Sequence, residues 1–117
     1  MELEHGKYVV LPVVLSEFMG TCLFEVCYNL NDGTFPNGLA LAMIIMIISS
    51  ISGGHCNPAT SLAVYINEQN WGNHFVFFIG IMLSQFFGAF AGLGISYLLR
   101  TQVIIDEFTG ESIYVPS

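Results

Sequence analysis

The residues with the clearest chemical potential are Asn57, Pro58 and Ala59, a polar and helix-breaking triplet inside a long apolar region. Unpaired backbone groups in hydrocarbon cost several kcal/mol each, so non-helical backbone at that depth must be buried in protein or line a wet cavity. Asn57 suits the capping position and Pro58 the first turn of a helix, which predicts a short helix over about 58–66. At roughly 13 Å, this helix is about half as long as the hydrocarbon is thick, so it can enter the membrane without crossing it.

The N-terminus of such a half-helix would act on whatever lies near the membrane midplane. It carries a partial positive charge, roughly half an elementary charge, which disfavours cations and protons there. The side-chain oxygen of Asn57 can accept from the helix backbone while its NH2 group donates outward. A water molecule or a small alcohol suits that donor, so the triplet favours a pore.

The remaining reactive side chains do not form a recognisable catalytic or metal site. His55 adjoins Cys56, but adjacent side chains diverge and no orienting acid is evident. The two other histidines, His5 and His74, lack further metal ligands. The cysteines are odd in number and lack Cys-x-x-Cys spacing; they are Cys22, Cys27 and Cys56. We therefore expect no enzyme activity, no bound metal and no cofactor.

The composition indicates a multi-pass integral membrane protein whose surroundings are lipid. Of the 117 residues, 54% are hydrophobic and only 9% are charged, whereas soluble domains carry about 25% charged residues. The chain has nine acidic residues and only two basic ones, Lys7 and Arg100, which gives a formal net charge of -7. Nucleic acid is excluded as a partner, because binding phosphates needs clustered basic residues.

Three apolar segments predict transmembrane helices over about 8–30, 35–52 and 75–99, with a turn-forming stretch of Asn, Asp, Gly and Pro after the first. The second segment is the shortest. The predicted fold class is an all-α membrane protein with three transmembrane helices plus one re-entrant half-helix. Residues 101–117 are expected to form a polar, acidic C-terminal arm, either strand-like or disordered. Three spans place Lys7 and Arg100 on opposite faces, so basic residues do not determine the orientation or identify the membrane.

Three motifs in order resemble one known family. The segment Ile51-Ser-Gly-Gly-His-Cys-Asn-Pro-Ala-Thr-Ser-Leu62 resembles the first Asn-Pro-Ala loop of the aquaporin, or major intrinsic protein, family. Glu17-Phe-Met-Gly-Thr21 is similar to its first-helix Glu-x-x-Gly-Thr motif, and Gln85-Phe-Phe-Gly-Ala89 is similar to its third-helix Gln-x-x-Gly motif. The resemblance covers about residues 8–100, which correspond to one of the family's two inverted repeats. We therefore expect residues 1–100 to form a single aquaporin-like repeat.

The resemblance implies a role for each matched position. Asn57, Pro58 and Ala59 would form the midplane constriction of a channel for water or small neutral solutes. The loop would be supported by Glu17 and Gln85 through hydrogen bonds, by His55 as a brace, and by Gly53 and Gly54 through a tight backbone path. Close helix packing is predicted at Gly20, Gly88 and Gly92, of which the last two form a small-xxx-small pair.

The sequence also departs from the family pattern. It has no second Asn-Pro-Ala triplet, no filter arginine following one, and no fourth to sixth helix. One repeat cannot close the family's pore, so a second repeat would be required. Asn37 falls near the outer filter position of the second helix, where aromatic or small residues are more typical. Glu25 places an ionisable group within a span, where it must face protein or water, and we expect it to contact a neighbouring subunit.

Two functional hypotheses follow from these observations. In the first, the chain is one half of an aquaporin-like channel, either a fragment of a longer protein or a half-chain that assembles with a second half. It passes water or small neutral solutes when it is paired with a second repeat. In the second, it is a degenerate, non-conducting structural subunit of a larger membrane complex. The intact Asn-Pro-Ala loop favours the channel, whereas the missing repeat, the short second helix and Glu25 favour the structural subunit.

Overall fold

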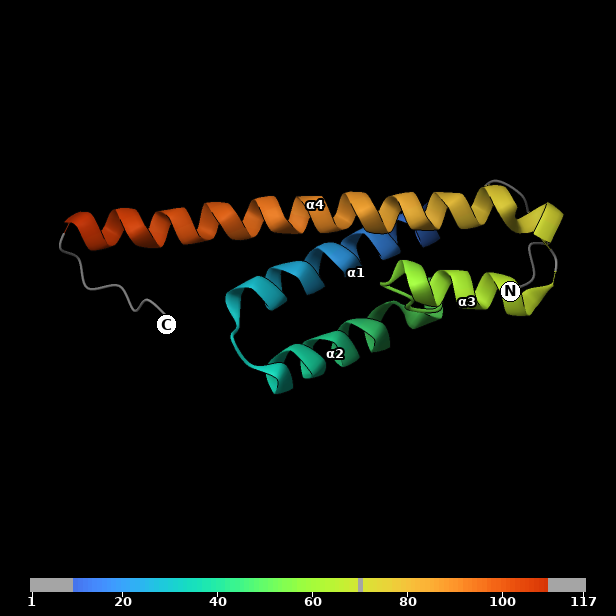
Figure 1. The fold of residues 1–117 in the computed structure, drawn as a ribbon, viewed down its shortest axis with the longest axis horizontal. Coiled ribbons are helices and arrows are strands. Elements are labelled where there is room, and N and C mark those ends of the chain that lie inside the picture. The colour runs from blue at the N-terminus through green and yellow to red at the C-terminus, as the bar shows by residue number, and fades with distance from the viewer. Residues whose placement is uncertain (1–9, 70, 110–117) are drawn as a thin grey trace.

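The computed structural model describes residues 10–69 and 71–109, and these residues form helices and short connections without any strand. Figure 1 shows the arrangement. Three helices contain apolar stretches long enough to cross a membrane, at Val10–Leu30, Thr34–Ser52 and His74–Arg100. The predicted class, an all-α membrane protein, is confirmed. In chain order the elements are α1 (Val10–Leu30), α2 (Thr34–Ser52), α3 (Pro58–Glu68) and α4 (Trp71–Thr109).

Local sequence signals account for where α2 and α3 begin and end. Pro36 lies in the first turn of α2, where a missing N–H is tolerated. Gly53 ends α2 in the left-handed conformation, with φ of 90°, and its N–H donates to the Ser49 carbonyl at 3.0 Å. The 11 residues of α3 begin at Pro58 and end before Gln69, which also has a positive φ of 55°. At about 1.5 Å per residue, α3 is roughly 16 Å long and covers only half of a membrane.

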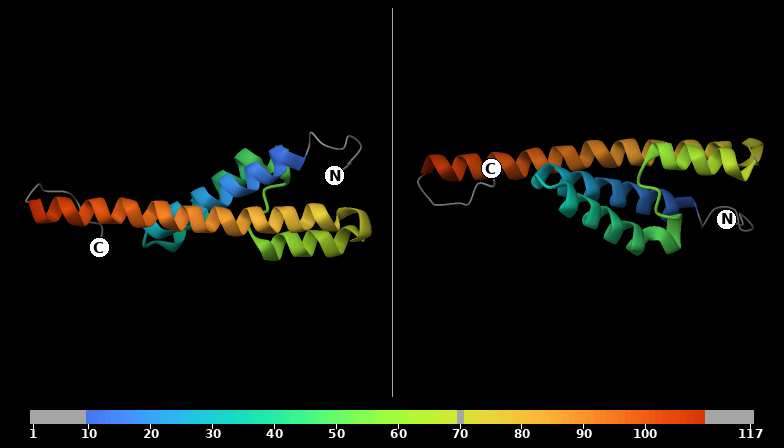
Figure 2. Two further views of the ribbon diagram at one scale, coloured as in Figure 1. Left: turned by 90° about the horizontal axis from the view of Figure 1, so that it is seen from above. Right: turned by 60° about the horizontal axis from the view of Figure 1, so that its bottom comes forward.

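Helix α1 is the centre of the bundle. It packs against both α4 and α2, and α3 packs against α4. In Figure 2 (left) the α1–α2 pair crosses α4, and the end of this pair near the loop over residues 53–57 lies on the opposite side of α4 from α3. Arg100, at the end of the third span, donates a hydrogen bond to the carbonyl of Asn29 near the end of α1. These contacts make α1 and α4 the frame on which the loop is held.

Glycines allow the two long helices to approach each other closely. A Cβ atom at Gly88 would overlap the carbonyl oxygen of Phe18, and one at Gly92 would overlap the carbonyl of Cys22. On the other side of α1, a Cβ at Gly20 would come within 2.7 Å of Ile48 on α2. Small residues that bring backbones together are typical of helix contacts in membranes, where burial of apolar surface alone does not drive association.

The surface and the interior have the polarity expected in lipid. Large apolar side chains such as Phe35, Met46 and Val76 are about four-fifths exposed. The largest fully buried side chains include Gln85 and Glu17, which are polar. In a bilayer this distribution is favourable, because apolar side chains meet lipid and polar groups are satisfied inside the protein.

The segment after Arg100 differs from the sequence-based expectation. Residues 101–109 continue α4 as helix, so the expectation of a strand-like or disordered arm was wrong for this part. Nothing breaks the helix there, because Thr101 to Phe108 contains neither glycine nor proline. Residues 1–9 and 110–117 lie outside the described residues, and with them His5, Lys7 and the end of the arm.

We expect Gly88→Ala to destabilise the chain and Gly94→Ala to leave it as stable as the wild type or more so. Both substitutions gain about 1 kcal/mol of helix propensity. A Cβ at position 88 meets the Phe18 backbone, whereas a Cβ at position 94 meets nothing within 4 Å. Overpacking of this kind costs about 1–3 kcal/mol. Thermal unfolding in detergent, followed by circular dichroism, measures the difference. Equal melting temperatures for the two variants would contradict the close approach of α1 and α4.

Candidate functional site

Asn57 caps the half-helix α3 at its N-terminus. Its backbone is extended, with φ of -155° and ψ of 125°, and its side-chain oxygen accepts from the N–H of Ala59 at 2.9 Å. Pro58 occupies the first helical position, where a missing N–H has no cost. Asn57 and Ala59 are exposed. The NH2 group of Asn57 therefore has no partner within the described residues and remains able to donate to a small molecule.

The loop before Asn57 follows a path that ordinary residues disfavour. Gly53 and Gly54 have φ of 90° and 68°, values that glycine adopts without strain. Cys56 also has a positive φ, 47°, although it is not glycine. A non-glycine residue in this region persists only where its surroundings hold it. The contacts of the neighbouring N–H groups show what holds it here.

The carboxylate of Glu17 holds the loop from inside the protein. Its Oε1 accepts from the Ser52 hydroxyl at 2.6 Å and from the N–H of His55 at 2.9 Å. Its Oε2 accepts from the N–H of Cys56 at 2.7 Å and from the Gln85 amide at 2.9 Å. Glu17 is 0% exposed. All four partners donate, which fits an ionised carboxylate, and the negative charge beside the start of α3 also stabilises the helix dipole.

Gln85 connects this carboxylate to α3. One N–H of its amide reaches Glu17 and the other donates to the Ser61 hydroxyl at 2.9 Å. Ser61 in turn lies 3.1 Å from Nδ1 of His55 and can donate its proton there. The oxygen of the same amide, Oε1 of Gln85, is buried without a hydrogen-bond partner among the described residues. The network therefore ties α1, α2, α3 and α4 to one loop.

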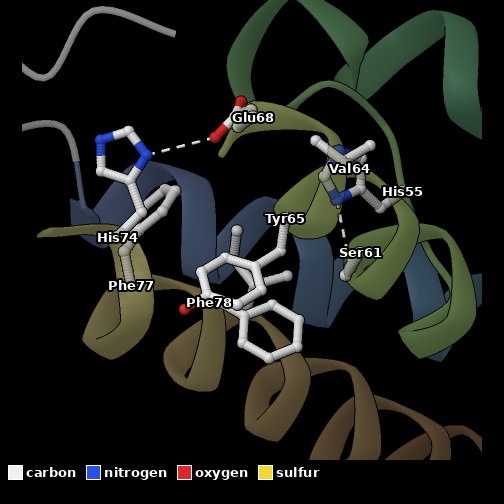
Figure 3. Close-up of a pocket in the computed structure, with 9 residues that line it drawn as sticks. His55, Ser61, Val64, Tyr65, Glu68, His74, Phe77 and Phe78 are labelled. Carbon is white, nitrogen blue, oxygen red and sulfur yellow. Dashed lines mark hydrogen bonds and ion pairs between the residues drawn. The ribbon is translucent and has the colours of Figure 1, made fainter. Parts of the chain in front are cut away.

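A small pocket lies between α3 and α4, and His55 of the loop also lines it (Figure 3). Its volume is about 30 Å³, which is enough to hold a water molecule. Tyr65 stacks on Phe78 with ring centroids 4.4 Å apart, and His74 lies 3.2 Å from the carboxylate of Glu68. These contacts attach the far end of α3 to the start of α4. Within the described residues no three His, Cys, Asp or Glu side chains gather closely enough to hold a metal ion.

A larger groove opens at the end of the molecule where α1 joins α2. Its volume is about 640 Å³, and residues of α1, the α1–α2 turn, the start of α2 and Arg100 line it. Asn37 belongs to this groove, and its side-chain oxygen is buried without a partner among the described residues. Phe24 and Leu41 supply apolar wall. A groove of this size can admit water and small polar molecules.

The structure brings some of the predicted residues together and leaves others apart. Glu17, His55 and Gln85 lie in one hydrogen-bond network around the loop, and Asn57 stands at its exposed end. Glu25 is separate from this network. It is half-buried on α1 beside Gly92, and its carboxylate accepts from Asn29 at 2.9 Å. Its contact with a neighbouring subunit stays a prediction.

Two members of the network, Ser52 and Ser61, were not assigned by the sequence analysis. Ser52 is 1% exposed and donates to Glu17, while it accepts from the N–H of Gly54 at 3.2 Å. Ser61 is 3% exposed and joins Gln85 to His55. The available signal was weak, because serine is common in membrane helices and bonds readily to its own helix backbone.

Comparison with known proteins identifies relatives of this chain. A family model described as major intrinsic protein matches residues 5–114. Aquaporin-8 of Mus musculus is 42% identical over 89 residues, which cover 73% of this chain and 33% of the relative. Aquaporin-5 of Rattus norvegicus is 40% identical over 112 residues, covering 85% of this chain and 41% of the relative. A probable glycerol uptake facilitator protein of Thermotoga maritima is 31% identical over 109 residues, which cover 75% of this chain and 44% of the relative. The chain spans less than half the length of these relatives, and no solved structure matches significantly.

We expect Glu17→Gln to destabilise the chain by on the order of 3 kcal/mol, because an amide presents N–H groups to donors that a carboxylate had satisfied. The matched control is Glu25→Gln, the same change on the same helix. The Glu25 side chain accepts from Asn29 alone among the described residues, so its replacement should cost less. Unfolding in detergent, followed by circular dichroism, compares the two. Equal losses of stability would show that Glu17 does not hold the loop.

Proposed function

Since this chain belongs to the major intrinsic protein family, we propose that it is one half of a membrane channel for water or small neutral solutes. It conducts when a second repeat of the same kind faces it. The observation that carries the proposal is the exposed Asn57 at the N-terminus of a half-helix, with its NH2 group available. The names of the relatives, aquaporins and a probable glycerol uptake facilitator, support a channel rather than an enzyme.

The chemistry around Asn57 favours neutral hydrogen-bonding solutes. The N-terminus of α3 directs about half a positive charge toward the midplane, which raises the energy of a cation there. The NH2 group donates to an oxygen atom, and water and alcohols carry such an atom. The wide groove near Asn37 offers these molecules a polar surface as they enter. Its apolar wall at Phe24 and Leu41 keeps their binding to the groove weak.

A second repeat is needed because polar groups at the start of α3 are exposed. Asn57 and Thr60 are exposed at the start of α3, although this end lies near mid-membrane depth if α3 enters from one face. Polar groups there must meet protein or water, because hydrocarbon cannot satisfy them. An opposing repeat would cover one side of these groups and leave a water-filled path on the other.

The substitution Asn57→Asp tests conduction without removing the cap. A carboxylate still accepts from the N–H of Ala59 and suits the helix dipole, but the NH2 donor is lost and a negative charge appears in the path. We expect stopped-flow osmotic shrinkage of proteoliposomes to show permeability above protein-free vesicles for the wild type, and at least a tenfold loss for Asn57→Asp.

The matched control is Asn67→Asp, which adds the same charge near the opposite end of α3, where the side chain is exposed. This variant should conduct like the wild type. Equal permeability of Asn57→Asp and the wild type would contradict a role for Asn57 in the path. Wild-type permeability no higher than that of empty vesicles, with the chain purifying among other membrane subunits, would favour the structural subunit instead.

A further inference from the structure

The pocket between α3 and α4 has a titratable pair at the end far from Asn57. Nδ1 of His74, on α4, lies 3.2 Å from the carboxylate of Glu68, the last residue of α3. We propose that this pair is a pH-dependent latch, which holds the last turn of α3 (residues 65–68) against α4 at acidic pH and releases it as the pH rises. Its effect on conduction rests on the proposed function, whereas the latch itself depends only on the contacts between α3 and α4.

Helix α3 is held by one narrow face. Among the described helices it packs only against α4, and of its 11 residues only Ser61 is buried. The residues of α3 that line the pocket have the spacing of one side of a helix; they are Ser61, Val64, Tyr65 and Glu68. The other side of α3 is exposed, at Leu62 and Ile66. A change at one position of the contacting face can therefore alter how firmly the helix is held.

The contacts along this face differ in their response to pH. Nearest the loop, Ser61 accepts from the amide of Gln85, which is neutral. Farther along, Tyr65 stacks on Phe78 with ring centroids 4.4 Å apart, a contact between uncharged rings. The pair of Glu68 and His74 comes last and contains two ionisable side chains. In this series the pair is the contact whose charge changes.

The proton on His74 decides how strongly the pair attracts. Histidine ordinarily changes its charge between pH 5 and 8, whereas carboxylates ordinarily stay ionised over that range. Protonated His74 attracts the Glu68 carboxylate, and neutral His74 leaves at most a hydrogen bond. The attraction is thus present at acidic pH and is lost as the pH rises. The two side chains are 16% and 32% exposed, so water and salt screen the pair in part and its release is graded.

Among the described residues, one other histidine faces the same pocket. His55 lines it from the loop, and Tyr65 lines it from α3. In Figure 3, His74 and Glu68 point toward each other at one side of the pocket, and His55 lies with Ser61 at the other side. Along α4, no Asp, Glu, Lys or further His follows His74 before the end of the third span. His55 is therefore the titratable group that an experiment must separate from the pair.

Two cysteine probes report the state of the latch. Val64→Cys places a thiol in the pocket, and Ile66→Cys places one on the exposed side of the same helix. Their rates of modification by a water-soluble thiosulfonate are measured in detergent at pH 5.5 and 8.0, with the chain that lacks both probes as the background for its native cysteines. The ratio of the two rates removes the pH dependence of the reaction itself. We expect the ratio of position 64 to position 66 to rise at least twofold from pH 5.5 to 8.0.

Two substitutions fix the latch in one state each. Glu68→Gln keeps an oxygen acceptor and removes the charge, so the ratio should be high at both pH values. His74→Lys keeps a positive charge throughout this range, so the ratio should be low at both. A ratio that does not change with pH in the chain carrying the probes alone would overturn the latch. So would a pH dependence that persists in Glu68→Gln, because it would assign the response to His55 or another group.

Conduction gives a separate measurement. When the last turn of α3 leaves α4, it moves toward its exposed side, where an opposing repeat would leave the path. Osmotic permeability of proteoliposomes with the same pH on both sides should therefore fall at least twofold between pH 5.5 and 8.0, and should stay constant in His74→Lys. Constant permeability of a conducting wild type, with pH-dependent labelling, would keep the latch and remove its control of the path. A wild type that does not conduct would remove the proposed function, while the labelling ratio would still decide the latch.

Discussion

The buried carboxylate of Glu17 is the constraint on which the rest of this structure depends. It accepts four hydrogen bonds from three other parts of the chain: Ser52 at the end of α2, two backbone N–H groups of the loop, and Gln85 on α4. A charge inside a membrane protein is tolerable only when it is fully satisfied in this way. The network therefore favours one conformation of the loop, because another conformation would leave the buried carboxylate without some of its hydrogen bonds.

Holding the loop in that arrangement is what exposes Asn57. The backbone from Gly53 to Cys56 turns through three positive φ angles, and its N–H groups face inward toward Glu17. Asn57 then caps α3 with its oxygen, so its NH2 group is left outward. The outward donor at the start of α3 is thus a consequence of satisfying the polar groups behind it.

The bundle around this network is held mainly by close backbone approach, because apolar burial gives little stabilisation in lipid. Gly88 and Gly92 bring α4 onto α1, and Gly20 lets α1 meet α2. Among the described helices, α2 contacts only α1; it also touches the loop at Gly54 and Cys56, and the start of α3 is exposed. The described part of the chain is therefore ordered around its loop, while much of α2 and the start of α3 stay uncovered.

The sequence by itself determined the membrane class, the short capped helix after Asn57 and the motif residues Glu17 and Gln85, because hydropathy, capping and motif spacing are local or nearly local signals. The extent of α4 beyond Arg100 was not predicted, since β-branched and acidic residues there fit several conformations. Only the tertiary structure assigned Ser52 and Ser61 to the network, because a serine hydroxyl finds a distant partner only after the helices have packed. Hydrogen bonds between segments 35 to 68 residues apart depend on where those segments meet, and no local pattern encodes that.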